Sequence, residues 1–295
     1  MNLLGVRDLD RAALTEWLDA AGAARSLSDD AHAGRAVALV FNEPSTRTRF
    51  SFERAAGRLG AQVLPFSPAS SSATKGESLL DTARLLVAVG AELLVVRDRM
   101  AGTPHHLAAR TGVAVVNAGD GANEHPTQGL VDAFTLREHF GSLVGLSVAI
   151  VGDVRHSRVA RSSSAALTAL GARVTVAGPR SLVPREYTAE GVAVAHLIDD
   201  VIGMDAIMML RVQRERLGRA QIGTVADYRA GWGLTEARAE RMAAHARVLH
   251  PAPINRGVEI DDAVADGAHS LIQEQQRNGV PVRMAVLDRC LRMAR

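Results

Sequence analysis

The sequence predicts an α/β protein of two domains, each a parallel β-sheet flanked by helices. Short apolar runs alternate with segments of helical periodicity, and this alternation restarts after a helical segment that ends near Phe140. A chain of 295 residues is long enough for two domains of ordinary size. Because 47% of the residues are hydrophobic, each domain can bury a core.

In the first half of the chain, four apolar runs have the length and the turn-bounded setting of buried strands. These predicted strands cover residues 36–41, 62–66, 93–97 and 113–117. Helices are predicted over residues 9–24, 45–60 and 105–111, from about residue 77, and from the Gly-rich segment 117–128 to residue 140.

In the second half, the same alternation of apolar runs and helical segments predicts a second parallel sheet. Strands are predicted over residues 147–151, 173–177, 205–210 and 246–249, with helices over 159–170 and 279–295. Gly152 and Asp153 follow the first of these strands, but the spacing of a dinucleotide fingerprint and the Walker pattern are both missing. A nucleotide role is therefore not favoured.

Residues 43–53, Glu-Pro-Ser-Thr-Arg-Thr-Arg-Phe-Ser-Phe-Glu, join the first strand to a helix. Ser45 or Thr46 can cap this helix, whose first backbone N–H groups have no partners within the helix. Two hydroxyl groups and two guanidinium groups gather at this positive helix end, which is the composition of an anion site. The alternative is an ordinary capped helix with exposed arginines.

Composition disfavours several other classes of protein. Arginines and acids are interspersed, with a formal net charge of +2, and only 3% of residues are aromatic, so a nucleic-acid surface is not favoured. No apolar run reaches the roughly 18 residues of a membrane span, and residues 1–10 do not read as a signal peptide. The single cysteine, Cys290, cannot form an internal disulfide, and we interpret it as a passive residue of the last helix. We expect a cytoplasmic protein.

Lys75 is the only lysine in the chain, and every other one of the 34 Lys and Arg residues is an arginine. It lies in a Ser-rich loop, residues 67–76. Retention of a lysine against this bias favours a role that needs a compact, mobile ammonium group, although chance retention is the alternative.

Five motifs in order, over nearly the whole chain, resemble those of the aspartate and ornithine carbamoyltransferase family. The resemblance implies that the S-T-R-T loop holds the phosphate of carbamoyl phosphate and that a neighbouring subunit inserts the Ser-rich loop. It also implies that Arg97 bridges phosphate and carbonyl oxygen, that His125 donates to that oxygen, and that Gln128 contacts the carbamoyl amide. The implied site residues are Ser45, Thr46, Arg47, Thr48, Ser71, Lys75, Arg97, His125 and Gln128, of which Thr48, Lys75, Arg97 and His125 are catalytic.

The motifs of the second half resemble those of the aspartate enzymes more than those of the ornithine enzymes. Arg158, at the end of G-D-V-R-H-S-R, would bind the α-carboxylate of aspartate, and Arg211 of R-V-Q would bind the β-carboxylate with help from Gln213. Two arginines suit two carboxylates because each can form a bidentate ion pair. Pro251 and Ala252 of H-P-A-P would contact the carbamoyl and amino groups through backbone carbonyls. The S-M-G and H-C-L-P segments of ornithine enzymes are missing.

The resemblance also implies how the domains divide and close. The carbamoyl-phosphate domain would comprise residues 1–131 with the C-terminal helix 279–295, and the aspartate domain residues 132–278. The residues implied for domain closure are Glu43, Arg158 and Arg216.

The implied reaction transfers a carbamoyl group from carbamoyl phosphate to the α-amine of L-aspartate, a step of pyrimidine and UMP biosynthesis. It needs no cofactor and no metal; His105 and His106 lack companion ligands at a recognisable spacing. Shared sites imply a homotrimer, and the sequence leaves open a larger assembly with regulatory chains or dihydroorotase. A carbamoyltransferase for another amino acid and a catalytically silent scaffold homologue remain alternatives.

Overall fold

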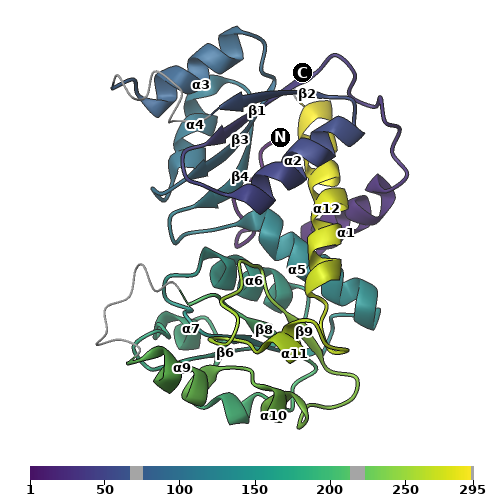
Figure 1. Ribbon diagram of the computed structural model, residues 1–295. Coiled ribbons are helices and arrows are strands. Elements are labelled where there is room, and N and C mark those ends of the chain that lie inside the picture. Colours follow the sequence, from purple (N-terminus) through teal and green to yellow (C-terminus); the bar gives the residue numbers. More distant parts are fainter. Residues whose placement is uncertain (67–75, 213–222, 294–295) are drawn as a thin grey trace. The chain divides into compact units, whose positions relative to one another are not determined.

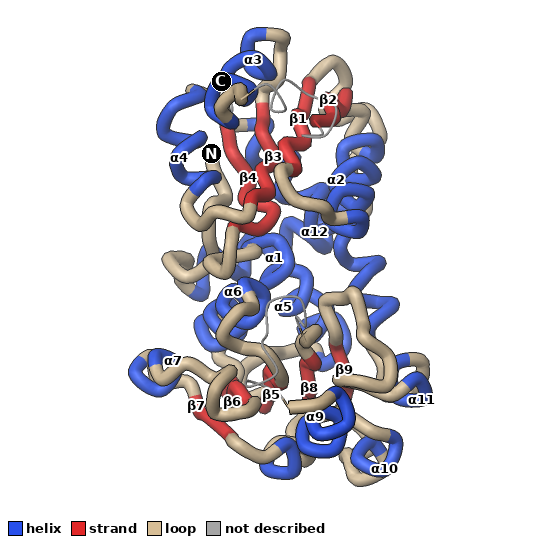
Figure 2. Tube along the Cα trace, turned by 60° about the vertical axis from the view of Figure 1, so that its left-hand side comes forward, coloured by secondary structure: helices blue, strands red, loops and turns tan. Residues whose placement is uncertain are grey.

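The computed structural model describes residues 1–66, 76–212 and 223–293. Contacts divide the chain into two compact units, Met1–Phe134 with Arg277–Arg295 and Thr135–Gln276. Each unit is a parallel sheet with helices around it (Figure 1, Figure 2), which confirms the predicted fold class. Among the described residues, no helix is long and apolar enough to cross a membrane.

The first unit is built on a four-stranded sheet with the strand order β2-β1-β3-β4 and parallel neighbours throughout. Its elements are α1 (Arg11–Ala24), β1 (Ala36–Phe41), α2 (Thr46–Arg58), β2 (Gln62–Phe66), α3 (Leu79–Ala88), β3 (Leu93–Asp98), α4 (Thr103–Thr111) and β4 (Ala114–Asp120), followed by α5 (Pro126–Phe140), which runs on into the second unit. All four predicted strands are confirmed, and β3 and β4 extend further than predicted, to Asp98 and Asp120.

Helices cover both faces of this sheet, so β1 is buried along its whole length. Side chains of α3 and α4, among them Ala83 and Leu107, pack on one face against alternate strand residues such as Val40 and Val96. Helix α2 lies on the other face (Figure 1).

Local signals explain where the first helices begin and end. Helix α1 begins at Arg11 rather than at residue 9 because the Asp10 carboxylate caps it, accepting from Ala13 N. After α2 the chain turns at Gly60, where φ is +72°, and a Cβ there would lie 2.8 Å from Asp29 O. Gly60 therefore ends this helix, as predicted.

The second unit is built on a five-stranded sheet with the order β7-β6-β5-β8-β9, again with parallel neighbours throughout. Its elements are β5 (Ser147–Val151), α6 (Arg158–Ala169), β6 (Arg173–Ala177), α7 (Glu186–Ala189), β7 (Ala193–Ala195), η3 (Ile198–Asp200), β8 (Ala206–Met209), α9 (Val225–Trp232), α10 (Glu236–Ala239), β9 (Arg247–Leu249) and α11 (Asp262–Ala265). The four predicted strands are confirmed. The three-residue β7 and the one-turn helices were missed because they are too short to show a period.

The last helix, α12 (Ile272–Arg292), begins earlier than the predicted residue 279. Pro281 lies inside it, whereas a proline usually marks the first turn of a helix, so the sequence suggested a later start. Its C-terminal part contacts the first unit: Asp288 pairs with His32 at 2.8 Å, and Leu291 O accepts from Arg35 Nη2 at 3.0 Å.

Both sheets have a topological switch point, where the chain leaves a central strand toward opposite edges. In the first sheet this point lies between β1 and β3, and in the second between β5 and β8. In open α/β sheets, ligands bind in the crevice at the carboxyl ends of the strands at such a point.

Candidate functional site

In the first unit, Arg97 lies at the carboxyl end of β3, as predicted, beside the loop that follows β1. Its Nε lies 2.7 Å from Glu43 Oε1, and the two side chains are 13% and 10% exposed. Its Nη1 donates to Ala118 O at 3.1 Å and lies 3.5 Å from His125 Nε2. The structure therefore brings a guanidinium and an imidazole together at the switch point, next to a carboxylate that balances the charge.

Helix α2 begins at this same edge of the sheet. Ser45 is its N-cap residue, in extended backbone, but its side chain makes no capping hydrogen bond. Thr48 is buried in the first turn, whereas Thr46 and Arg47 are exposed. Arg49 forms an ion pair with Glu53 along the helix, so Arg47 is the arginine exposed at the helix start. The predicted anion-binding groups thus gather at one helix end.

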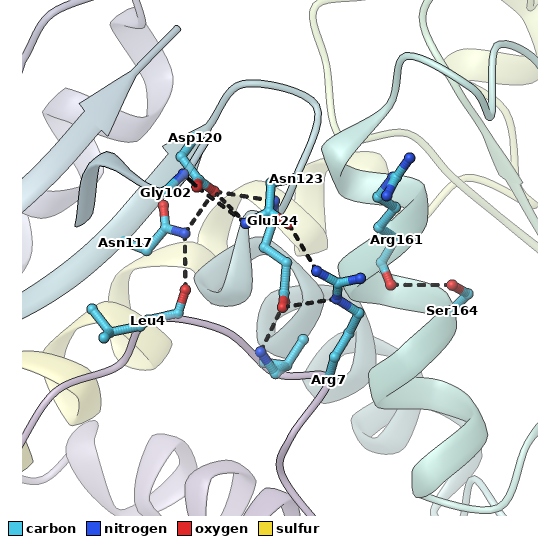
Figure 3. A network of polar contacts seen from close by, with 10 residues as sticks. Leu4, Arg7, Gly102, Asn117, Asp120, Asn123, Glu124, Arg161 and Ser164 are labelled. Carbon is cyan, nitrogen blue, oxygen red and sulfur yellow. Dashed lines mark hydrogen bonds and ion pairs between the residues drawn. The ribbon is translucent and has the colours of Figure 1, made fainter. Parts of the chain in front are cut away.

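The turn between β4 and α5 is built around a buried carboxylate, Asp120 (Figure 3). It accepts hydrogen bonds from Gly102 N at 2.7 Å, Asn117 Nδ2 at 2.8 Å and Glu124 N at 3.1 Å. These bonds tie the carboxylate to three separate positions around the turn. The turn that precedes His125 is consequently well defined.

The N-terminal segment secures the same turn from outside (Figure 3). Glu124 Oε2 accepts from Val6 N at 2.8 Å, and Glu124 Oε1 accepts from Arg7 Nε at 3.2 Å. A Cβ on Gly5 would lie 2.5 Å from Glu124 Oε1, so a larger residue there would require the carboxylate to move. Sequence reasoning assigned no role to these residues, because a contact between residues 6 and 124 leaves no local signal.

Gln128 lies in the first turn of α5, and its backbone N–H donates to His125 O at 2.9 Å. Its side chain is 8% exposed, and Nε2 donates to Asp132 Oδ1 at 2.8 Å. Asp132 was missed by sequence reasoning, although its spacing of four residues from Gln128 could have indicated the pair.

In the second unit, both predicted carboxylate-binding arginines lie at the switch point. Arg158 is the first residue of α6, which follows β5, and Ser157 caps the helix by accepting from Ala160 N. Arg211 follows β8 after Leu210. Because β5 and β8 are parallel neighbours, their carboxyl ends place these two arginines at one edge of the sheet.

The loop after β9 has a defined backbone at Ala252. Ala252 N donates to His250 Nδ1 at 2.8 Å, so the proton of this buried imidazole is on Nε2, which lies 3.3 Å from Glu259 Oε1. Ala252 has a φ of 54°, a left-handed conformation that is unfavourable for a residue with a Cβ. Asn255 Nδ2 donates to Val212 O at 3.1 Å and thereby ties this loop to the segment of Arg211.

Four predicted site residues lie outside the described residues: Ser71, Lys75, Gln213 and Arg216. The expected pairing of Glu43 with Arg158 and Arg216 stays a prediction; within the first unit, Glu43 pairs with Arg97. In the parts of the chain that the structure describes, no three His, Cys, Asp or Glu side chains form a group that could hold a metal.

The fold and the site define a class: an α/β protein of two open parallel sheets, each with arginines at the carboxyl ends of its central strands. Two family models match the chain: "Aspartate/ornithine carbamoyltransferase, carbamoyl-P binding domain" over residues 1–138 and "Aspartate/ornithine carbamoyltransferase, Asp/Orn binding domain" over residues 144–290. The chain belongs to the aspartate/ornithine carbamoyltransferase family.

Relatives and solved structures agree with this membership. The chain is 50% identical to an aspartate carbamoyltransferase catalytic subunit of Sorangium cellulosum, covering 97% of this chain and 91% of that one. It is 50% identical to the same subunit of Myxococcus xanthus, with coverage of 98% and 99%. The catalytic subunit of M. jannaschii aspartate transcarbamoylase superposes with a TM-score of 0.87 at 31% identity, covering 99% and 98%. A Trypanosoma cruzi aspartate transcarbamoylase with carbamoyl phosphate and aspartate superposes with a TM-score of 0.86 at 28% identity, covering 97% and 94%.

Proposed function

We propose that this protein transfers the carbamoyl group of carbamoyl phosphate to the α-amine of L-aspartate, giving N-carbamoyl-L-aspartate and phosphate. The observation that carries the proposal is the convergence of Arg97 and His125, 3.5 Å apart, at the switch point beside the start of α2. The relatives named aspartate carbamoyltransferase support the same reaction.

The first unit would bind carbamoyl phosphate. Ser45, Thr46 and Arg47, together with the N–H groups of the first turn of α2, would hold the phosphate, since a helix N-terminus attracts anions. Thr48, Arg97 and His125 would donate to the carbonyl oxygen, where negative charge develops when the amine attacks. Preorganised donors of this kind commonly contribute about 10²–10³-fold each in rate.

The second unit would bind aspartate. Arg158 would take the α-carboxylate and Arg211 the β-carboxylate, while Pro251 and Ala252 would offer backbone carbonyls to the amino and carbamoyl groups. The neutral amine attacks the carbonyl carbon, the C–N bond forms, and the bond between that carbon and the phosphate oxygen breaks. The amine proton passes to the departing phosphate, so no protein base is required, and orientation of both substrates supplies much of the rate.

The test is formation of carbamoyl aspartate by purified protein, followed in wild type and in Arg211→Ala. We expect turnover with aspartate, and a loss of at least about 10²-fold in kcat/KM for aspartate in the variant, because a charged pair is removed. The matched control is Arg173→Ala, an exposed arginine at the amino end of β6. Turnover with ornithine or another amine, and none with aspartate, would contradict the assignment of the pocket.

We also propose a cytoplasmic homotrimer in which Ser71 and Lys75 of a neighbouring subunit complete each site; Gln213 would assist Arg211, and Glu43, Arg158 and Arg216 would favour domain closure. Support comes from the lone Lys75 in an arginine-rich chain. Mixing the inactive variants Lys75→Ala and Arg47→Ala should restore part of the activity through hybrid interfaces. A mixture as inactive as its components would count against shared sites.

A further inference from the structure

A buried polar cluster lies between α5 and α12 and consists of Gln128, Asp132 and Arg283. The proposed mechanism gives no role to Asp132 or Arg283. Their exposed fractions are 8%, 0% and 4%. Gln128 Nε2 donates to Asp132 Oδ1 at 2.8 Å, and Asp132 interacts electrostatically with Arg283. All three residues belong to the first unit.

Arg283 is held firmly on its other side. Its Nη1 donates to Ser51 Oγ and to Gly279 O, both at 3.0 Å, and its Cζ lies 5.2 Å from the centre of the Phe52 ring. Ser51 and Phe52 belong to α2, which carries the anion-binding residues in its first turn, and α12 lies beside α2 (Figure 1). The Arg283 guanidinium is therefore held in place against α2, the helix whose first turn is proposed to bind phosphate.

Arg283 gives Asp132 a buried partner of opposite charge. Burial lowers the pKa of Arg283 to about 10, while the charge of Asp132 acts in the opposite direction, so the guanidinium is charged at neutral pH. A fully buried guanidinium requires a negative partner, and removal of that partner is unfavourable for both groups. An ionised carboxylate can only accept hydrogen bonds.

The direction of the Gln128 amide follows from this chemistry. Nε2 must face Asp132, because an amide oxygen there would meet a carboxylate oxygen with no hydrogen between them. The oxygen Oε1 is then the end of Gln128 that is directed away from Asp132. A ligand that meets Gln128 consequently meets an acceptor.

We propose that Asp132, which accepts from Gln128 Nε2, is a positioning residue that fixes Gln128 as a hydrogen-bond acceptor toward the ligand, so that the site selects acyl phosphates whose acyl group carries an N–H donor. This inference rests on the proposed function. Carbamoyl and acetyl phosphate have nearly the same shape but differ in having NH₂ or CH₃ at this position. A buried acceptor left without a donor disfavours the methyl compound by about 10-fold or more.

The experiment measures discrimination, defined as the inhibition constant of acetyl phosphate divided by the KM of carbamoyl phosphate at saturating aspartate. In Asp132→Asn the new amide can donate as well as accept, so the Gln128 amide can flip by 180°. Discrimination should then fall about 10-fold. In Gln128→Ala, discrimination should fall similarly, and adding Asp132→Asn to Gln128→Ala should change it no further. The control Asp81→Asn, on a side chain that is 60% exposed, should keep the wild-type ratio.

Because Asp132→Asn leaves Arg283 without its negative partner, the double variant Asp132→Asn with Arg283→Met gives a second measurement in which the buried charge pair is removed as a whole. A purely structural role for Asp132 predicts lower stability and lower kcat with an unchanged ratio, and that result would overturn the proposal. An unchanged ratio in Gln128→Ala would overturn it as well. Absence of carbamoyl transfer in the wild type is a different result, which refutes the proposed function itself.

Discussion

Replacing Glu124 by alanine tests how the N-terminal segment holds the turn in front of His125. Glu124 is 4% exposed and accepts a buried hydrogen bond of 2.8 Å from Val6 N and a second bond from Arg7 Nε. In Glu124→Ala, Val6 N loses its acceptor in a buried place, which costs about 1–3 kcal/mol. Loss of the pair with Arg7, whose side chain is 42% exposed, adds at most about 1 kcal/mol.

Together these effects predict a local destabilisation of about 1–4 kcal/mol. Amide hydrogen exchange is the suitable assay, because a protein of two units need not unfold in one step. We expect the amide of Val6 to exchange about 5–10³-fold faster in Glu124→Ala than in the wild type, since 1.36 kcal/mol is tenfold.

Two further variants separate the contributions. Glu124→Gln keeps an oxygen that accepts from Val6 N, so it should change the exchange rate of this amide far less. Arg7→Ala should lower the local stability by at most about 1 kcal/mol. The reasoning would be refuted by an unchanged exchange rate in Glu124→Ala. It would also be refuted if Arg7→Ala had as large an effect as Glu124→Ala, since the bond to Val6 would then contribute little.

Three more predictions follow from the structure. The Ser147 hydroxyl and N–H lower the pKa of Asp205 to about 2. The resulting stabilisation of the fold is therefore present above about pH 4 and is lost as the pH falls to 2. In urea unfolding across this range, Ser147→Ala should lower the free energy of unfolding by about 1–2 kcal/mol near neutral pH and by little at pH 2. Gly60→Ala should lower the free energy of unfolding by about 1–2 kcal/mol or more, because φ is +72° there, whereas Gly57→Ala, inside α2 with open space around it, should raise it by about 0.5–1 kcal/mol. Burial raises the pKa of the Cys290 thiol to about 12, so a thiol reagent should modify it in denatured but not in native protein, and rapid labelling of native protein would contradict this.

The sequence by itself determined the features that depend on neighbours along the chain. The strands were predictable because buried parallel strands are short, continuously apolar runs, and Gly60 marked the end of α2 because few other residues adopt its φ. The gathering of hydroxyls and guanidiniums at the start of α2 was predictable, because these residues lie within a few positions of a helix N-terminus wherever the helix lies; their role in anion binding stays a prediction. The position of Arg97 at a strand end followed from the same local pattern.

The tertiary structure alone decided which distant groups meet. The bond from Val6 to Glu124 and that from Arg283 to Ser51 join residues more than a hundred positions apart, so no periodicity indicates them. The start of α12 before Pro281 likewise depends on its packing, since the local sequence favours a later start. Burial of Arg283 beside Asp132 sets the charge and direction of the groups around Gln128, because the energy of a buried charge depends on all of its neighbours in space rather than on those in sequence.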